Sequence, residues 1–217
     1  MSAVDPAAVA EHLAAVRARL AERGRADVEV MAVTKTWPVA AVRAAVAAGC
    51  DAIGENYAQE MVAKLDGVEV GIPRVFIGRL QTNKARLLRG VVDMVATVDR
   101  ATLVDELARR MPGLAVLVQV STDGDPAKGG CPPAAVDDLV GRASAAGLDV
   151  RGLMTVAPTE GGPEAARPGF RTVRGLVDRL GLTVCSMGMS DDYLVAADEG
   201  ATQVRLGSVL FGARPRP

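Results

Sequence analysis

Lys35 closes a predicted buried strand, a position at which an amine can do chemistry. The run VEVMAVTK (28–35) is apolar up to this lysine, and the pair Trp37-Pro38 ends it, because the residue before a proline avoids the helical region. Burial lowers the pKa of an ammonium, and a neutral amine attacks aldehydes. The alternative is a solvent-exposed lysine that only ends the strand. Judged on this segment alone, the alternative is the better interpretation.

A second group of residues has the types that bind phosphate. Ser190 is predicted as the N-cap of a helix over 191–199, and Gly207-Ser208 opens the last segment of the chain. A serine hydroxyl and the free N–H groups of a helix start can hold an anion, and a glycine lets the backbone approach it closely. The two aspartates after Ser190 suit the helix dipole without any ligand, so a plain N-cap is an equal interpretation.

Arg205 lies inside an apolar strand predicted over 202–206. A buried guanidinium needs partners, because an unpaired buried charge is costly. An ion pair with a neighbouring carboxylate is the first expectation, and contact with a bound ligand is the second.

His12 is the only histidine and is expected on the surface of the first helix, so the sequence favours neither a catalytic triad nor a histidine-based metal site.

These residues need a scaffold of strands, and the sequence predicts an α/β fold in which strands and helices alternate. The predicted strands are 28–34, 51–54, 74–78, 92–97, 114–120, 150–156, 182–186 and 202–206. The predicted helices are one that starts at Asp5-Pro6, then 39–48, 57–66, 81–89, 100–110, 133–146, 164–180 and 191–199. Eight strands favour a closed (β/α)8 TIM barrel, a single domain over 1–217 with an extra N-terminal helix. A doubly wound sheet is the alternative, but no GxGxxG motif follows the first strand.

In such a barrel, functional residues stand at the carboxyl ends of the strands, and phosphate is often held after strands seven and eight. Lys35 follows the first predicted strand and Ser190 the seventh, and Gly207 and Ser208 follow the eighth. We therefore expect these residues to meet around one cavity at the mouth of the barrel.

The composition excludes several classes of function. The net charge of −1 gives no general attraction to nucleic acid or to an anionic membrane, and no apolar run is long enough to span a bilayer. We expect no signal peptide. Three cysteines, at positions 50, 131 and 185, form no CxxC pair, so neither a disulfide framework nor a zinc site is expected. The expected location is the reducing cytoplasm.

Taken in order, several segments of the chain resemble the pyridoxal phosphate homeostasis protein family, whose members look like the barrel domain of alanine racemase standing alone. The matching stretches are VMAVTKTWP (30–38), IGENYAQE (53–60), FIGRLQTNK (76–84), DGDPAKGG (123–130), VRGLMTV (150–156), CSMGMSDDY (185–193) and VRLGSVLFGAR (204–214). They cover nearly the whole chain after the first helix and are specific in combination. Position 79 departs from the family pattern, because it is arginine here and histidine in many members. This difference puts the role of this loop in ligand access in question.

The resemblance implies pyridoxal 5′-phosphate (PLP) as the cofactor. By this resemblance Lys35 would hold PLP as a Schiff base, Arg205 would face the ring nitrogen, and Asn56 would lie near the ring. The residues implied at the phosphate are Ser190, Gly207 and Ser208, with Ser186 and Met189 alongside. No catalytic residue and no metal ligand is assigned.

The function implied by the resemblance is intracellular PLP (vitamin B6) homeostasis without efficient catalysis. An arginine keeps its proton and would not strengthen the ring as an electron sink, and the second domain that supplies a tyrosine base in related racemases is not expected. PLP-dependent apo-enzymes are candidate partners, and a monomer is expected. A slow PLP-dependent amino-acid racemase and a Schiff-base aldolase on a phosphorylated sugar are the alternatives.

Overall fold

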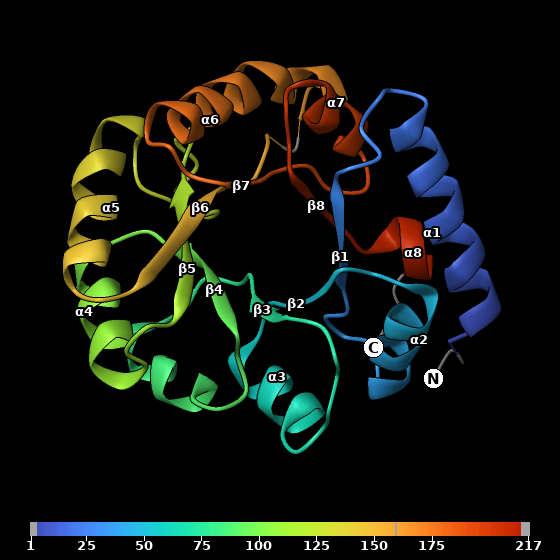
Figure 1. Ribbon diagram of the computed structural model, residues 1–217, viewed down its shortest axis with the longest axis horizontal. Coiled ribbons are helices and arrows are strands. Elements are labelled where there is room, and N and C mark those ends of the chain that lie inside the picture. Colours follow the sequence, from blue (N-terminus) through green and yellow to red (C-terminus); the bar gives the residue numbers. More distant parts are fainter. Residues whose placement is uncertain (1–3, 159, 214–217) are drawn as a thin grey trace.

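The protein forms a closed barrel of eight parallel strands with helices around it, in a computed structural model that describes residues 4–158 and 160–213 (Figure 1). Each strand pairs with the next along the chain, and β8 closes onto β1. The expected (β/α)8 TIM barrel with an N-terminal helix is therefore confirmed, and the doubly wound sheet is excluded.

The strands are short and end at one rim of the barrel. Their bounds are β1 Glu29–Val33, β2 Ala52–Glu55, β3 Arg74–Phe76, β4 Met94–Val98, β5 Ala115–Val120, β6 Asp149–Thr155, β7 Val184–Ser186 and β8 Gln203–Leu206. At the closure, Glu29 pairs with Gln203 and Met31 with Arg205. This register sets Arg205 beside the strand that leads into Lys35.

The helices cover the outside of the barrel. Their bounds are α1 Pro6–Ala21, α2 Val39–Ala48, α3 Ala58–Leu65, α4 Ala101–Arg110, α5 Val136–Ala145, α6 Arg167–Arg179, α7 Tyr193–Asp198 and α8 Ser208–Phe211, with 3-10 turns η1 Thr82–Leu88, η2 Pro133–Ala135 and η3 Pro163–Ala166. The Asp5 carboxylate accepts a hydrogen bond from the N–H of Ala7, which confirms the predicted cap of α1. No helix in the described part of the chain is long and apolar enough to cross a membrane.

Three predicted helices differ from the observed segments. The segment predicted over 81–89 is the 3-10 turn η1, and those predicted over 133–146 and 164–180 each begin with a 3-10 turn before the α-helix. Prolines open η2 and η3, and a proline fixes its φ angle and supplies no N–H. The observed strand ends lie within about two residues of the predicted ones, for example Phe76 against 78 for β3.

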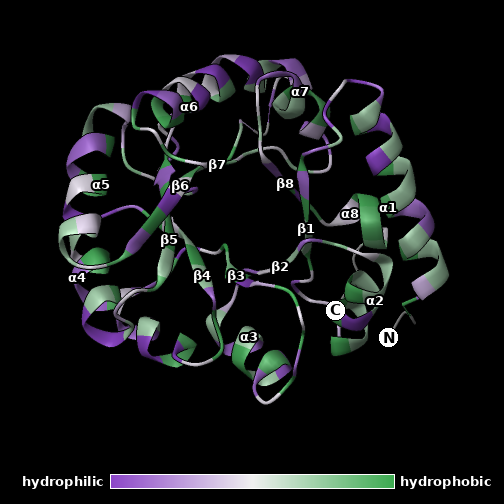
Figure 2. Cartoon of the chain, viewed as in Figure 1, coloured by the Kyte–Doolittle hydropathy of each residue, from purple (hydrophilic) through white to green (hydrophobic). Residues whose placement is uncertain are grey.

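Two apolar layers hold the barrel together. Inside it, a small cluster gathers side chains from six strands: Met31, Ala52, Val75, Ala96, Leu117 and Met154. A larger cluster fills the space between strands and helices, and α6 contributes Phe170, Val173 and Val177 to it. Figure 2 shows hydrophobic and hydrophilic residues alternating along the surrounding helices, as expected for helices with one buried face.

Gly78 permits a close approach between two loops at the mouth of the barrel. A Cβ atom at position 78 would lie 1.8 Å from the backbone oxygen of Asn56. The Gly78 carbonyl also accepts a 2.7 Å hydrogen bond from the Thr97 hydroxyl, which fixes it from the other side. The loop that carries Asn56 therefore keeps its place only if residue 78 has no side chain.

We predict that Gly78→Ala lowers the free energy of unfolding by about 3 kcal/mol, because a clash with backbone cannot be relieved by a rotamer change. Urea unfolding followed by circular dichroism measures the change. Gly141→Ala is the matched control, since a Cβ there meets nothing within 4 Å. It lies inside α5 and should stabilise the protein by about 0.5–1 kcal/mol. Equal effects of the two substitutions would contradict the packing argument.

Candidate functional site

The carboxyl ends of the strands enclose a cavity of about 350 Å³ that collects most of the residues predicted for the cofactor. Those that line it are Lys35, Asn56, Met189, Ser190, Arg205, Gly207 and Ser208. Ser186 is fully buried and lies beneath Arg205 instead of lining the cavity. Val33, Ile77, Met154 and Val156 supply apolar walls. The cavity is therefore apolar at its sides and polar where β1, β7 and β8 end.

Lys35 is half-buried and stands in a constrained turn just after β1. The next residue, Thr36, has a φ of 66°, and it is the one non-glycine residue with positive φ in the described parts of the chain. A β-branched residue in this region is strained, and the surrounding structure must hold it there. Trp37 packs against Phe211 of α8 with ring centroids 5.8 Å apart. The turn is thus fixed to the segment that follows β8.

A buried lysine on α3 holds this turn from the other side. The Lys64 ammonium donates hydrogen bonds to the Thr34 carbonyl at 2.8 Å and to the Glu55 carboxylate at 2.6 Å. It also donates to Glu60 at 2.8 Å, and the same Glu60 oxygen accepts the N–H of Thr36 at 2.6 Å. One cation therefore ties together the ends of β1 and β2 and supports the strained Thr36.

Glu55 is the most deeply buried acid of this network, with no exposed surface. Burial raises the pKa of its carboxyl, while hydrogen bonds from Lys64 and Thr34 oppose the rise. Its second oxygen, Oε2, is buried without a hydrogen-bond partner. Glu55 and Glu60 share the single ammonium of Lys64. Keeping the buried Glu55 carboxyl ionised therefore costs free energy.

Arg205 forms the floor of the cavity and is bound by neutral groups. Its guanidinium donates hydrogen bonds to the Ser186 hydroxyl at 3.0 Å and to the Thr155 carbonyl at 2.6 Å. The expected ion pair was wrong: among the described residues no carboxylate lies within salt-bridge distance of Arg205, since the ends of β6 and β7 supply a carbonyl and a hydroxyl instead. Burial lowers the pKa of Arg205 to about 10, so it stays charged at neutral pH.

A line of hydrogen bonds fixes Arg205 from below. The Ser186 hydroxyl donates to the Gln203 side-chain oxygen at 3.0 Å, and the Gln203 amide donates to the Glu29 carboxylate at 3.0 Å. Ser186 and Gln203 are both buried, whereas Glu29 opens to solvent. The guanidinium is thereby oriented toward the cavity.

Ser190 does not cap the helix that follows it, which corrects the prediction. Helix α7 begins at Tyr193, and Asp192 occupies its N-cap, where its carboxylate accepts the N–H of Met189. The Ser190 hydroxyl instead accepts the N–H groups of Gly207 at 3.4 Å and Val209 at 3.3 Å. It therefore joins the loop after β7 to the start of α8, and both Ser190 and Gly207 line the cavity.

Asn56 presents a buried side-chain oxygen, Oδ1, that has no hydrogen-bond partner among the described residues. The residue lines the cavity beside Lys35 and also lines a second, larger cavity of about 630 Å³. A buried acceptor without a donor is costly, and a ligand with a donor group would satisfy it. A donor group that enters this cavity would therefore find an unused acceptor at Asn56.

Sequence reasoning missed the network around Lys64. Its signals were a glutamate, Glu55, at the end of an apolar run, and Glu60 and Lys64 at the i,i+4 spacing of a helical ion pair.

Arg79, the departure from the family pattern, is exposed and donates to the Pro126 carbonyl at 3.1 Å. In the described parts of the chain no cluster of histidine, cysteine, aspartate and glutamate is suited to a metal ion.

This barrel has a lysine after β1 and Ser190, Gly207 and Ser208 in the segments after β7 and β8, and residues 4–215 match the model of the alanine racemase N-terminal domain family. The pyridoxal phosphate homeostasis protein of Pseudomonas aeruginosa is 40% identical over 95% of this chain and 96% of its own. The one of Aquifex aeolicus is 37% identical over 89% and 90%. The chain therefore belongs to the pyridoxal phosphate homeostasis protein family.

A solved structure supports the same assignment. PipY of Synechococcus elongatus, solved with PLP bound, superposes with a TM-score of 0.83 at 33% identity and covers 94% of this chain and 100% of its own. The resemblance stated from the sequence motifs is confirmed by these comparisons.

We predict that Lys64→Met lowers the free energy of unfolding by about 3–5 kcal/mol, because it leaves Glu55 buried without its cation. Arg142→Met is the control: Arg142 pairs with Asp105 at 2.7 Å, but both side chains are more than half exposed. Its loss should cost far less than the loss of Lys64, because exposed ion pairs add little to stability. Urea unfolding measures both, and similar costs would show that the Lys64 network is dispensable.

Glu55→Gln should alter how stability depends on pH. The pKa of Glu55 is raised in the folded protein, so its favourable contribution is complete below the unfolded value and is lost as pH rises through the folded value. The variant should therefore gain stability relative to the wild type as pH rises from about 4 to 7. Unfolding curves at several pH values test this, and a variant that loses stability relative to the wild type as pH rises would contradict it.

Proposed function

We propose that this protein binds PLP in the cavity between Lys35 and Arg205, holds it as a Schiff base on Lys35, and serves intracellular PLP homeostasis. The observation that carries the proposal is one cavity that combines a lysine amine and a fixed guanidinium with Ser190, Gly207 and Ser208 at the start of α8. The names of the relatives and the PLP-bound PipY structure support it.

The residues fit the parts of PLP. Lys35 would hold the aldehyde carbon, Arg205 would face the ring nitrogen, and Asn56 offers its unpartnered oxygen near the ring. Ser190, Gly207 and Ser208 would hold the phosphate where the start of α8 meets the loop after β7. Met189 lines the same wall, and Ser186 acts through Arg205.

Holding PLP is favoured over turnover by the chemistry of Arg205. PLP, when bound, supplies an aldehyde for Schiff-base formation and a ring that acts as an electron sink when its nitrogen is protonated. Arg205 keeps its own proton at neutral pH, since its pKa is about 10 even when buried. It would therefore donate a hydrogen bond without giving up a proton, which leaves the ring a weak electron sink.

The setting of the protein is part of the proposal. Cys50, Cys131 and Cys185 are buried free thiols, and burial raises the pKa of each to about 11, so they are poor nucleophiles. Free thiols suit a reducing cytoplasm, where PLP-dependent apo-enzymes would receive the cofactor. We propose that residues 1–217 act as one monomeric PLP-binding barrel domain.

We predict that a stoichiometric amount of PLP gives the purified protein a visible absorption band and that Lys35→Ala loses most of this band, because the other lysines lie outside this cavity. Borohydride reduction should fix PLP to the peptide that contains Lys35, as mass spectrometry can show. A Lys35→Ala variant with the same band would overturn the attachment. In the same experiment, single enantiomers of amino acids should keep their optical purity, and turnover at about 1 s⁻¹ or faster would favour the racemase.

A further inference from the structure

Lysine is rare in this chain and is confined to one rim of the barrel. Only four of the 25 basic residues are lysines, at positions 35, 64, 84 and 128, and the others are arginines. Lys64 is bonded at the ends of β1 and β2, and Lys128 is bonded to Asp123 and to the Ala157 carbonyl after β6. Lys84 follows β3 in η1, so every lysine belongs to the carboxyl ends of the strands.

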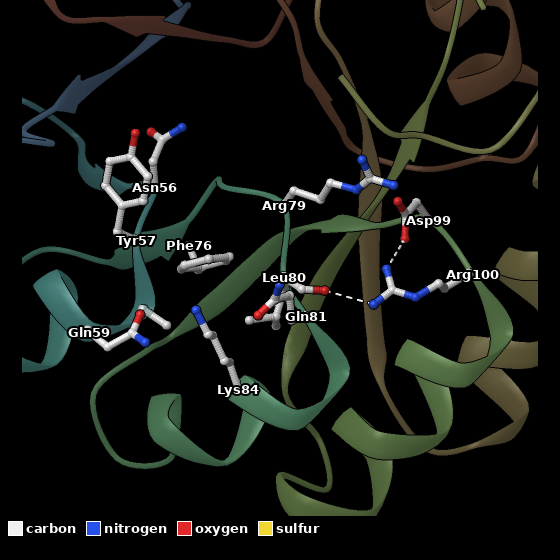
Figure 3. Close-up of a pocket in the computed structure, with 11 residues that line it drawn as sticks. Asn56, Tyr57, Gln59, Phe76, Arg79, Leu80, Gln81, Lys84, Asp99 and Arg100 are labelled. Atoms are coloured by element: carbon white, nitrogen blue, oxygen red, sulfur yellow. Dashed lines mark hydrogen bonds and ion pairs between the residues drawn. The ribbon is translucent and has the colours of Figure 1, made fainter. Parts of the chain in front are cut away.

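Lys84 differs from Lys64 and Lys128 because its side chain has no bonded partner in the described part of the chain. It is half-buried and lines the larger cavity of about 630 Å³, which adjoins the first at Asn56. Figure 3 shows its amine directed toward the side of this cavity where Phe76 and Gln59 lie. An uncommitted amine therefore faces a space next to the proposed cofactor site.

The other walls of this larger cavity suit an anionic, planar molecule. Arg79 and Arg100 line the side opposite Lys84 (Figure 3). Arg100 is committed to Asp99 at 2.6 Å and to the Leu80 carbonyl at 2.8 Å, whereas Arg79 has a single bond to a carbonyl and keeps donors for a phosphate. The ring of Tyr57 is 56% exposed at the rim and offers a stacking face.

We propose that this larger cavity is a second PLP site, in which the phosphate meets Arg79 and the aldehyde condenses reversibly with Lys84. The proposal rests on the proposed function of the first cavity. The Lys84 ammonium first loses a proton to solvent; its nitrogen then adds to the aldehyde carbon, one water leaves, and a carbon–nitrogen double bond forms. Because Asn56 borders both cavities, PLP that leaves Lys35 would have a short path to Lys84.

The test titrates the protein with PLP, reduces each sample with borohydride, and maps the labelled lysines by mass spectrometry. Lys35 should be labelled first and Lys84 second, ahead of the bonded Lys64. Lys84→Arg keeps the positive charge but removes the aldehyde-reactive amine, so it should abolish the second label and leave labelling of Lys35 unchanged. Arg79→Ala should slow labelling of Lys84 about tenfold, the effect of one lost charge-assisted contact.

Pyridoxal, which lacks the phosphate, separates a built site from general amine reactivity. It should label Lys84 about tenfold more slowly than PLP, since it cannot use the cation at position 79. Equal labelling by the two aldehydes, or equal labelling of Lys84 and Lys64, means nonspecific reaction of a surface amine only and overturns the proposal. Label at Lys84 without label at Lys35 would instead overturn the proposed function and leave this second site standing.

Discussion

The shape of the mouth of the barrel depends on the ammonium of Lys64. It is bonded to the end of β1 through the Thr34 carbonyl, to the end of β2 through Glu55, and to Glu60, which in turn bonds the strained Thr36. A positive φ at a β-branched residue persists only where surrounding contacts enforce it. Lys35 lies between Thr34 and Thr36, so this network fixes the backbone from which its side chain extends.

A second polar network supports the cavity at the ends of β6, β7 and β8. Arg205 is fixed by Thr155 and Ser186, and the bonds continue through Gln203 to Glu29 at the surface. Buried polar groups of this kind are costly unless they are satisfied, and satisfied networks favour a single arrangement. The cavity is therefore preformed by the chain itself, with an amine on one side and a guanidinium on the other.

The fold and most of the site were predictable from the sequence for a physical reason. Parallel strands buried on both faces appear as continuous apolar runs, so the strand ends that carry Lys35 and Arg205 could be located. The predicted cap at Ser190 was wrong because capping rules consider the nearest helix, whereas this hydroxyl bonds to residues after the next strand, at Gly207 and Val209. The network of Lys64 was missed for the same reason, since its partners meet only in the closed barrel.

Lysine and arginine occupy different places in this protein, and the difference matters for the aldehyde chemistry proposed for the two cavities. An aldehyde condenses with an amine, whereas a guanidinium stays protonated and does not compete for it. Arginine provides the ion pairs on the outer surface, as with Arg142 and Asp105 or Arg179 and Asp137. Lysine is placed only at the rim, where Lys64 and Lys128 are bonded to carboxylates. A reactive aldehyde therefore meets few amines outside the mouth of the barrel. The preference for arginine over lysine on the outer surface thus contributes to selectivity for the site.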